Sequence, residues 1–297
     1  MSHRFKLCKP KVIITAPAHL ANVQAACKDS GDLNAKIFVL DAAAEAALVA
    51  SEPVCNGDHG PLTADTAEPP VPKPAGPITN GYHEPQTADG ETPSVAALLT
   101  HGTSDWFRIS DLDTAKSTIA CMFSTSGTTG LPKVSQLSHH ALVAQHLSVQ
   151  SPSKRYPVRR LISLPFFNMF ASGIVHVEPL LTGEPMYVLS RFDLQAYVSG
   201  IHKYQITDTA TAPLMLIYML KSGLPLKEKL GSLRYIWNGS APVDKETLKA
   251  FYNVLPDEAM IAGIWGMSET GAQTAFKWFE KDDSGSVGRI IPGVEMK

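Results

Sequence analysis

The sequence has no paired cysteines and no excess of charge of either sign. Its four cysteines, Cys8, Cys27, Cys55 and Cys121, are far apart and form no Cys-x-x-Cys pair, which argues against a disulfide framework and a zinc site. The 26 basic and 28 acidic residues give a net charge of −2, without the basic excess typical of proteins that bind nucleic acid. We therefore expect a protein of a reducing compartment, with no nucleic acid among its partners.

Long apolar runs and targeting signals are missing as well. No stretch approaches the ~18 apolar residues that a membrane-spanning helix needs, and residues 1–12 are basic without the apolar segment of a secretory signal. We predict a cytoplasmic protein with no membrane span. The chain begins almost directly with an apolar strand and stops at Lys297 within a strand-like segment. We interpret both ends as cuts, so a peroxisomal address beyond Lys297 stays open.

What the sequence does contain is an alternation of strand-like and helix-like segments. Of its 297 residues, 44% are hydrophobic and 18% are charged, as in globular proteins. Apolar or β-branched runs predict strands over residues 12–15, 37–40, 119–123, 161–164, 186–189, 235–237 and 260–264. Amphipathic stretches predict helices over residues 19–27, 138–149, 193–204, 213–221 and 244–254. The alternation predicts an α/β fold of mostly parallel sheets flanked by helices.

Composition divides the chain into three parts. Residues 1–50 contain two short strands around a helix, the pattern of a βαβ segment. Residues 51–93 are rich in Gly, Pro, Asp and Thr, a composition that buries too little apolar surface to fold. This part is either a long surface loop or disordered insert, or a linker between domains. Residues 94–297 carry the remaining alternation and form the predicted α/β core.

The most informative segment is residues 123–133, with the sequence Phe-Ser-Thr-Ser-Gly-Thr-Thr-Gly-Leu-Pro-Lys. It leaves an apolar strand and combines hydroxyl side chains with two glycines, a combination that can bind phosphate oxygens through backbone N–H and hydroxyl groups. Lys133 adds a mobile positive charge suited to a polyphosphate. The spacing Gly-x-x-Gly-x-x-Lys differs from the Walker pattern. We predict a phosphate-binding loop outside the P-loop class, and the alternative is a polar turn between strand and helix.

This segment resembles the phosphate-binding signature of the adenylate-forming superfamily, which includes acyl- and aryl-CoA synthetases, luciferases and the adenylation domains of peptide synthetases. Four later stretches resemble superfamily motifs in the same order: residues 164–168, 238–242, 265–270 and 285–295. The 4-coumarate-CoA ligase-like enzymes are the most similar branch. The resemblance implies the incomplete large N-terminal domain of such an enzyme, truncated at both ends and without the small C-terminal catalytic domain.

The resemblance also implies roles for individual residues. The phosphates of ATP would contact Thr125, Ser126, Gly127, Thr128, Thr129, Gly130 and Lys133. The adenosine part of ATP or AMP would contact Gly239, Ser240, Ala241, Trp265 and Gly266. Ser268 would contact the α-phosphate, and Glu269 would bind Mg²⁺, which prefers carboxylate oxygen. The implied catalytic residues are Lys133, Ser268 and Glu269.

Simpler interpretations stand beside these roles. Glu269 is also explained as an acidic residue at a helix N-terminus, and Trp265 as a buried core residue. We interpret His139 and His140 as structural or solvated, and Asp193 as a helix cap.

The residues implied for the acyl pocket are Asn168, Met169, Phe170, Ile174, Trp237, Ser240, Ile264 and Gly266. Asn168 stands where related CoA ligases commonly have a His that gates the pocket, and an amide cannot titrate or stack as an imidazole does. Ile264 stands where aromatic-acid ligases often have Gly, and Trp237 is large. These side chains would fill volume that a ring could otherwise occupy, so we expect a shallow pocket that favours a small carboxylic acid or none.

These features predict an AMP-forming carboxylate-CoA ligase, present as a fragment with weak or no independent activity. In the implied reaction a carboxylate attacks the α-phosphorus of ATP, giving acyl-AMP and pyrophosphate, and the thiolate of CoA then displaces AMP. Mg²⁺ would assist the first step, and a separate C-terminal domain would complement the fragment. The alternative is a non-catalytic remnant of the same fold that binds a nucleotide or a partner protein.

Overall fold

A computed structural model of the chain describes residues 1–31, 35–44, 92–100, 108–125, 130–150, 154–278, 280–282 and 284–297. The chain divides into two compact units, Met1–Phe107 and Arg108–Lys297, which are described separately. The predicted insert over residues 51–93 lies outside the described residues except for its last two. None of the described helices has the length and apolar content needed to cross a bilayer.

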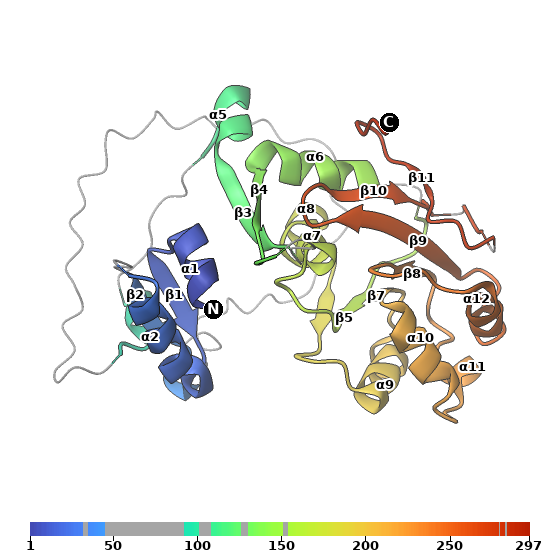
Figure 1. Ribbon diagram of the computed structural model, residues 1–297. Coiled ribbons are helices and arrows are strands. Elements are labelled where there is room, and N and C mark those ends of the chain that lie inside the picture. The colour runs from blue at the N-terminus through green and yellow to red at the C-terminus, as the bar shows by residue number, and fades with distance from the viewer. Residues whose placement is uncertain are drawn as a thin grey trace, which may run out of the picture. The chain divides into compact units, whose positions relative to one another are not determined.

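The first unit contains a small parallel sheet (Figure 1). Its elements are α1 (Ser2–Cys8), β1 (Val12–Thr15), η1 (Pro17–His19), α2 (Leu20–Asp29), β2 (Lys36–Val39) and α4 (Ala96–Leu99). Strands β1 and β2 pair in parallel, with Val12 opposite Lys36. The helix between them, α2, buries Val23 and Ala26. The predicted strand–helix–strand order is therefore present, whereas α1 was not predicted.

A seven-stranded sheet organises the second unit (Figure 1). Its strands are β5 (Arg160–Ile162), β6 (Met186–Val188), β7 (Asp208–Thr211), β8 (Tyr235–Asn238), β9 (Met260–Met267), β10 (Gly271–Ala275) and β11 (Arg289–Ile290). The order across the sheet is β11-β10-β9-β8-β7-β5-β6. The five strands from β9 to β6 are parallel, and β10 and β11 continue the sheet in antiparallel pairing.

Alternation along the strands produces two separate hydrophobic cores. In β8, Ile236 packs into the core formed with the first helical group, whereas Tyr235 and Trp237 belong to the core on the opposite face. The first helical group consists of α9 (Leu194–Tyr204), α10 (Pro213–Leu220), α11 (Leu226–Lys229) and α12 (Lys245–Tyr252). The second group, separate from the first in Figure 1, consists of α6 (His139–Val149), α7 (Met169–His176) and α8 (Glu178–Thr182). The sheet is therefore flanked by helices, as the sequence predicts.

An antiparallel hairpin precedes the second helical group. It consists of β3 (Ile119–Ser124) and β4 (Val134–Ser138), and the short helix α5 (Leu112–Ser117) lies before it. The buried side chains Phe123 and Leu137 form a small core with Met169 of α7. The sequence predicted the helix over residues 138–149, which agrees with α6, but it did not predict a strand between the glycine-rich loop and that helix. The structure inserts β4 there, and α6 begins only after Ser138, whose side chain accepts a hydrogen bond from the backbone N–H of Ala141 at 3.2 Å.

Local signals position the other helices as expected. The Asp193 carboxylate accepts a hydrogen bond from the N–H of Ala196 at 2.8 Å, so it caps α9. Pro213 occupies the first turn of α10, where its missing N–H has no cost. The strand β7 escaped prediction because its sequence, Asp-Thr-Ala-Thr, looks polar although all four residues are buried.

Candidate active site

All eight residues predicted for the acyl pocket line one cavity of about 430 Å³. Trp237 and Ile264 reach it from β8 and β9, and the side chains of Met169, Phe170 and Ile174 reach it from α7. These residues come together because alternate residues of β8 and β9 face α7, on the side of the sheet that contains the core around Trp237. The volume is at the lower end of the range for sites that bind small molecules.

One end of the cavity is formed by the turn that follows β8. Gly239 is required there because a Cβ at this position would lie 2.7 Å from Cγ2 of Ile264. Ser240 has a φ of 74°, an uncommon value for a residue other than glycine. The buried Asn238 amide supports the turn by donating to Oγ1 of Thr211 at 3.1 Å, and the Thr211 hydroxyl donates to the Trp237 carbonyl at 3.2 Å. Packing and hydrogen bonds thus hold this strained backbone in place.

A second turn, residues 268–270, connects β9 to β10 at the same end of the sheet. It carries Ser268, which lines the cavity, and the exposed Glu269. No helix begins at Glu269, so the helix-dipole interpretation of this residue is wrong. Trp265 is 39% exposed, so it is not a buried core residue. We call the two turns, residues 239–241 and 268–270, the carboxyl edge.

The side chain of Gln145 ties the carboxyl edge to α6. Its Nε2 donates a hydrogen bond to the carbonyl oxygen of Thr270 at 2.7 Å, across 125 residues of sequence. The same side chain lines the cavity. Nothing in the local sequence around Gln145 predicts this contact, because its acceptor is a backbone group far along the chain.

The glycine-rich loop joins β3 to β4. The N–H of Thr125 donates to the carbonyl oxygen of Lys133 at 2.9 Å, which closes the base of the loop. Gly130 and Lys133 are exposed. The predicted phosphate-binding residues Ser126, Gly127, Thr128 and Thr129 lie outside the described residues.

Asn168 caps the helix that forms the cavity wall. Its Oδ1 accepts a hydrogen bond from the N–H of Phe170 at 2.9 Å, at the N-terminus of α7. Related ligases commonly have a gating His at this position, and the sequence put the same role for Asn168 in doubt. In the structure Asn168 stabilises the start of α7, because its amide oxygen accepts a hydrogen bond from a helix N–H that would otherwise lack a partner.

A buried histidine packs against α7 and also lines the cavity. His146 of α6 is 7% exposed and lines the cavity. Its ring occupies the space beside Gly173 of α7, where a Cβ would lie 1.8 Å from its Nε2. Burial lowers the pKa of His146 to about 4, so the imidazole is neutral at pH 7.

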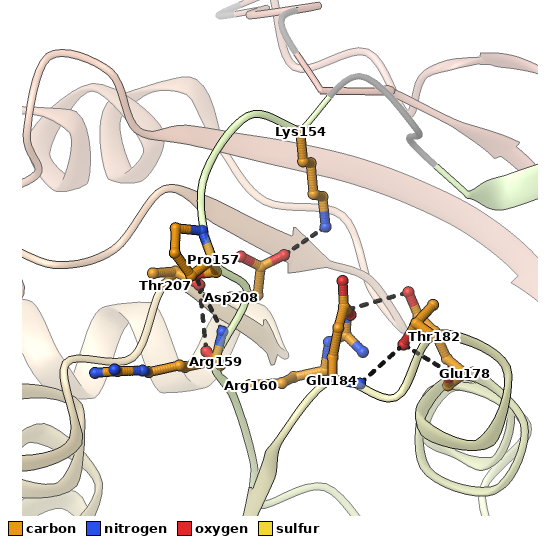
Figure 2. Close-up of polar contacts among 9 residues, drawn as sticks. All are labelled: Lys154, Pro157, Arg159, Arg160, Glu178, Thr182, Glu184, Thr207 and Asp208. Carbon is orange, nitrogen blue, oxygen red and sulfur yellow. Dashed lines mark hydrogen bonds and ion pairs between the residues drawn. The ribbon is translucent and has the colours of Figure 1, made fainter. Parts of the chain in front are cut away.

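Five ionisable residues, three of them buried, form a charged cluster at the other end of the cavity. The members of this charged cluster are Lys154, Arg160, Glu178, Glu184 and Asp208 (Figure 2). Nη2 of Arg160 lies 3.1 Å from Oε1 of Glu178 and 3.1 Å from Oε2 of Glu184. Lys154 pairs with Asp208, which is fully buried. Of these five, Glu178 alone lines the cavity.

Aromatic rings connect this cluster to the cavity wall. The Arg160 guanidinium lies 5.3 Å from the centre of the Trp237 ring, and the Lys154 ammonium lies 5.1 Å from it. Burial raises the pKa of the Glu178 carboxyl, and the positive charge of Arg160 opposes that rise. The cavity therefore has a carboxyl edge of turns and small polar groups, and an opposite end where a carboxyl group contacts buried charges.

A family model described as AMP-binding enzyme matches residues 1–297 of the chain. The chain belongs to this family. Nicotinic acid-CoA ligase pyr1 of Aspergillus fumigatus is 31% identical over 306 residues, which cover 100% of this chain and 48% of that protein. Nicotinic acid-CoA ligase olcI of Penicillium canescens is 32% identical, over 100% of this chain and 50% of that protein. The chain thus spans about half the length of these relatives.

Another relative and a solved structure are also similar to this chain. The Arabidopsis thaliana protein 4-coumarate--CoA ligase-like 9 is 32% identical over 60% of this chain and 32% of that protein. The solved luciferase-like enzyme of the mealworm Zophobas morio has a TM-score of 0.70 at 19% identity, over 98% of this chain and 58% of that one. The predicted superfamily and the α/β fold are both confirmed.

Only some of the residues predicted to bind the nucleotide line the cavity of this AMP-binding family member. Three residues predicted for the nucleotide, Ser240, Gly266 and Ser268, line it together with the acyl-pocket residues. The others with a described position do not: Thr125, Gly130, Lys133, Gly239, Ala241, Trp265 and Glu269. Sequence reasoning missed the lining residues Gln145, His146, Val149, Glu178, Met267, Gly271 and Ala272.

The donor set near the carboxyl edge fits magnesium better than a transition metal. Among the described residues there is no group of three or more His, Cys, Asp or Glu side chains that could hold a metal ion. A single exposed carboxylate, that of Glu269, lies on the turn beside the cavity. Mg²⁺ needs no more from a protein when phosphate oxygens and water complete its coordination.

Proposed function

We propose that the chain is the acid- and nucleotide-binding part of an AMP-forming carboxylate-CoA ligase. One observation supports this most directly: a single cavity is lined both by the residues predicted for the acid and by Ser240, Gly266 and Ser268 from the predicted nucleotide turns. An acid bound between α7 and β8 would present its carboxylate toward the carboxyl edge. In such a ligase the two reactants are held adjacent before reaction, which lowers the entropic cost of their meeting.

The reaction requires two anions to approach, so its main needs are positioning and neutralisation of charge. Lys133 would contact the phosphates and the departing pyrophosphate, and the Ser268 hydroxyl would donate a hydrogen bond to the α-phosphate. Glu269 would hold Mg²⁺, which supplies positive charge to the phosphate oxygens when bound. ATP and CoA are the cosubstrates of this proposal, and the cytoplasm is the proposed location.

The sequence led us to expect that Trp237 and Ile264 fill the volume of a ring, but the cavity leads us to propose a small aromatic carboxylic acid as the substrate. The cavity volume of about 430 Å³ and the aromatic walls, Phe170 and Trp237, suit one ring rather than a long alkyl chain. The names of two relatives state nicotinic acid, a ring of this size. Because the chain spans about half of those relatives, we propose that a C-terminal domain, in the same protein or in another chain, completes the activity.

The proposal is tested by nucleotide binding and by acid-dependent exchange between ATP and pyrophosphate. We expect ATP with Mg²⁺ to raise the melting temperature of the chain, since a ligand that binds only the folded state stabilises it. Lys133→Ala is expected to weaken ATP binding about tenfold, or ~1.4 kcal/mol. Lys249→Ala, on the exposed side of α12, serves as the matched control. A folded chain that binds neither ATP nor AMP would contradict the proposal.

Exchange activity separates the ligase from the alternative, a non-catalytic remnant of the fold. The short span relative to the relatives favours testing this alternative directly. AMP binding with exchange at background, unchanged when a relative's C-terminal domain is added, would support the remnant. Exchange that needs Lys133 and Glu269 would reject it. Strong exchange with long-chain acids would contradict the proposed substrate class.

A further inference from the structure

The charged cluster lies at the end of the cavity opposite to the carboxyl edge. Strands β5, β7 and β8 begin together, with Arg160 opposite Asp208 and Asp208 opposite Tyr235. Ser240 follows β8 at its other end, in the turn beyond Asn238. Glu178, held by Arg160, therefore contacts the cavity at the amino ends of the strands, and Ser240 contacts it at their carboxyl ends.

This charged cluster has one more carboxylate than cations. Its carboxylates are Glu178, Glu184 and Asp208, and its cations are Lys154 and Arg160. Arg160 is 1% exposed and does not line the cavity, so a ligand in the cavity would contact Glu178 and not the guanidinium. An excess of negative charge is costly here because Glu178 and Asp208 are buried, although Glu184 is partly exposed. A ligand that brings a proton or a hydrogen-bond donor to Glu178 would lower that cost, and a ligand that brings a second anion would raise it.

We propose that Glu178 recognises a ring nitrogen, so that this cavity selects a pyridine-type carboxylic acid over its carbocyclic equivalent. The inference rests on the proposed function, because it places the acid's carboxylate toward the carboxyl edge and the far side of its ring toward Glu178. A pyridine nitrogen and a carboxylate are both acceptors, so one proton taken up from solvent is shared between them. Trp237 and Phe170 provide flat walls for the ring.

The environment of Glu178 supports a proton shared with the ring nitrogen, because neighbouring groups act in opposite directions on the protonation of its carboxyl group. Burial favours the neutral form of its carboxyl group, whereas Arg160 and Lys154 favour the charged form and Glu184 and Asp208 oppose it. His146 also lines the cavity, and with a pKa of about 4 it stays neutral between pH 6 and 8. Within that range the proton taken up on binding belongs to the pair formed by Glu178 and the ring nitrogen.

Three acids of equal ring size test the inference on the unaltered chain: nicotinate, benzoate and isophthalate. Their affinities are measured by ligand-observed NMR with mutual competition, from pH 6 to pH 8. We expect nicotinate to bind about tenfold more tightly than benzoate at pH 6, the value of one hydrogen bond to a charged group. Its affinity should rise as the pH falls, and that of benzoate should stay constant. Isophthalate should bind most weakly.

The outcomes separate this inference from the proposed function. Equal binding of nicotinate and benzoate, or tightest binding of isophthalate, overturns the recognition of a ring nitrogen and leaves the ligase proposal intact. If none of the three acids binds, the inference and the proposed substrate class both fail. Stronger binding of 4-hydroxybenzoate than of nicotinate would show that the group recognised is a hydroxyl, and would also overturn the inference.

Glu178→Gln and Glu184→Gln form a matched pair of variants, because both carboxylates lie 3.1 Å from the same Arg160 nitrogen and only Glu178 lines the cavity. We expect Glu178→Gln to lose the dependence of nicotinate affinity on pH, because an amide N–H donates to a ring nitrogen without taking up a proton, and Glu184→Gln to retain that dependence. An equal loss in the two variants would mean that the effect acts through Arg160, which contradicts direct contact with Glu178. Thermal unfolding of each variant establishes that it is folded, and the comparison of the three acids needs no variant.

Discussion

The two ends of the cavity are built in different ways. At the carboxyl edge, short turns present backbone groups, glycines and small polar side chains, and most of these residues are exposed. At the opposite end, the charged cluster consists of long side chains from separate elements, with Arg160 and Asp208 completely or almost completely buried. Backbone turns tolerate loss of a side chain, whereas a buried ion pair leaves an unpaired charge when one partner is removed. Substitutions at the carboxyl edge should therefore affect ligands, and those in the charged cluster should affect stability.

The largest effect is expected when the central cation of the charged cluster is removed. Arg160→Met leaves Glu178 and Glu184 without their shared partner, which should cost about 3–5 kcal/mol of the free energy of unfolding. Denaturant unfolding of the second unit measures this loss. Arg159→Met, at the exposed neighbouring position, should change stability by less than about 0.5 kcal/mol. Similar losses of stability in the two variants would show that the buried ion pairs of the charged cluster contribute no more than an exposed arginine. The expected difference in stability between the charged cluster and the carboxyl edge would then be wrong.

An intermediate effect is expected from His146, the buried imidazole that lines the cavity. Its pKa falls from 6.5 to about 4 on folding, so below pH 6.5 the unfolded chain binds a proton that the folded chain does not. Stability should therefore fall by roughly 3 kcal/mol as the pH drops from 6.5 to 4, and should not depend on this group above pH 6.5. His146→Leu should lose this part of the pH dependence.

The control for this prediction is His139→Asn at an exposed position, which should leave the pH profile as it is in the unaltered chain. Denaturant midpoints measured from pH 4 to pH 7.5 make the comparison. A profile for His146→Leu that parallels the unaltered chain would show that the imidazole is accessible to protons in the folded state.

The smallest effect on stability is expected at the carboxyl edge itself. Gln145→Ala removes the hydrogen bond to the carbonyl oxygen of Thr270, which should cost about 1 kcal/mol, since one neutral hydrogen bond contributes about that much. Hydrogen exchange of the amides in residues 268–271 should become faster, and ATP affinity should fall a few-fold. Gln136→Ala, exposed on β4, is the control. Unchanged exchange in this turn would show that the backbone alone holds it.

The contrast between the two ends also explains what the sequence could predict. The carboxyl edge is encoded by continuous strings, such as residues 238–242 and 265–270, so a short stretch was enough to expect its place and its chemistry. The charged cluster has no such string, because Lys154 and Asp208 are 54 residues apart and each looks like an ordinary charged residue. Strand β7 was missed for the same reason, since Asp208 becomes suited to a buried strand only when Lys154 pairs with it.

The residues that line the cavity also divide into those that the sequence predicted and those that it missed. The residues 168–170 and Ile174 were expected because they follow one motif along α7, and they do line the cavity. His146 and Gly173 were missed, because the space that the imidazole fills exists only when α6 and α7 are packed together. Pairwise fits of this kind depend on tertiary contacts and leave no local pattern.

The position of Arg160 in β5 has a consequence for how this strand finds its neighbours. Along the strand, Arg160 and Ile162 face one side, and Leu161 faces the other, where it packs with Tyr197 and Ile201. A slip of one residue would turn the guanidinium into that apolar layer and move Leu161 among the carboxylates. Such a misaligned strand would incur both a desolvated charge and lost apolar packing. Arg160 thus specifies the pairing register of this three-residue strand with β6 and β7, because the shifted register is much less stable.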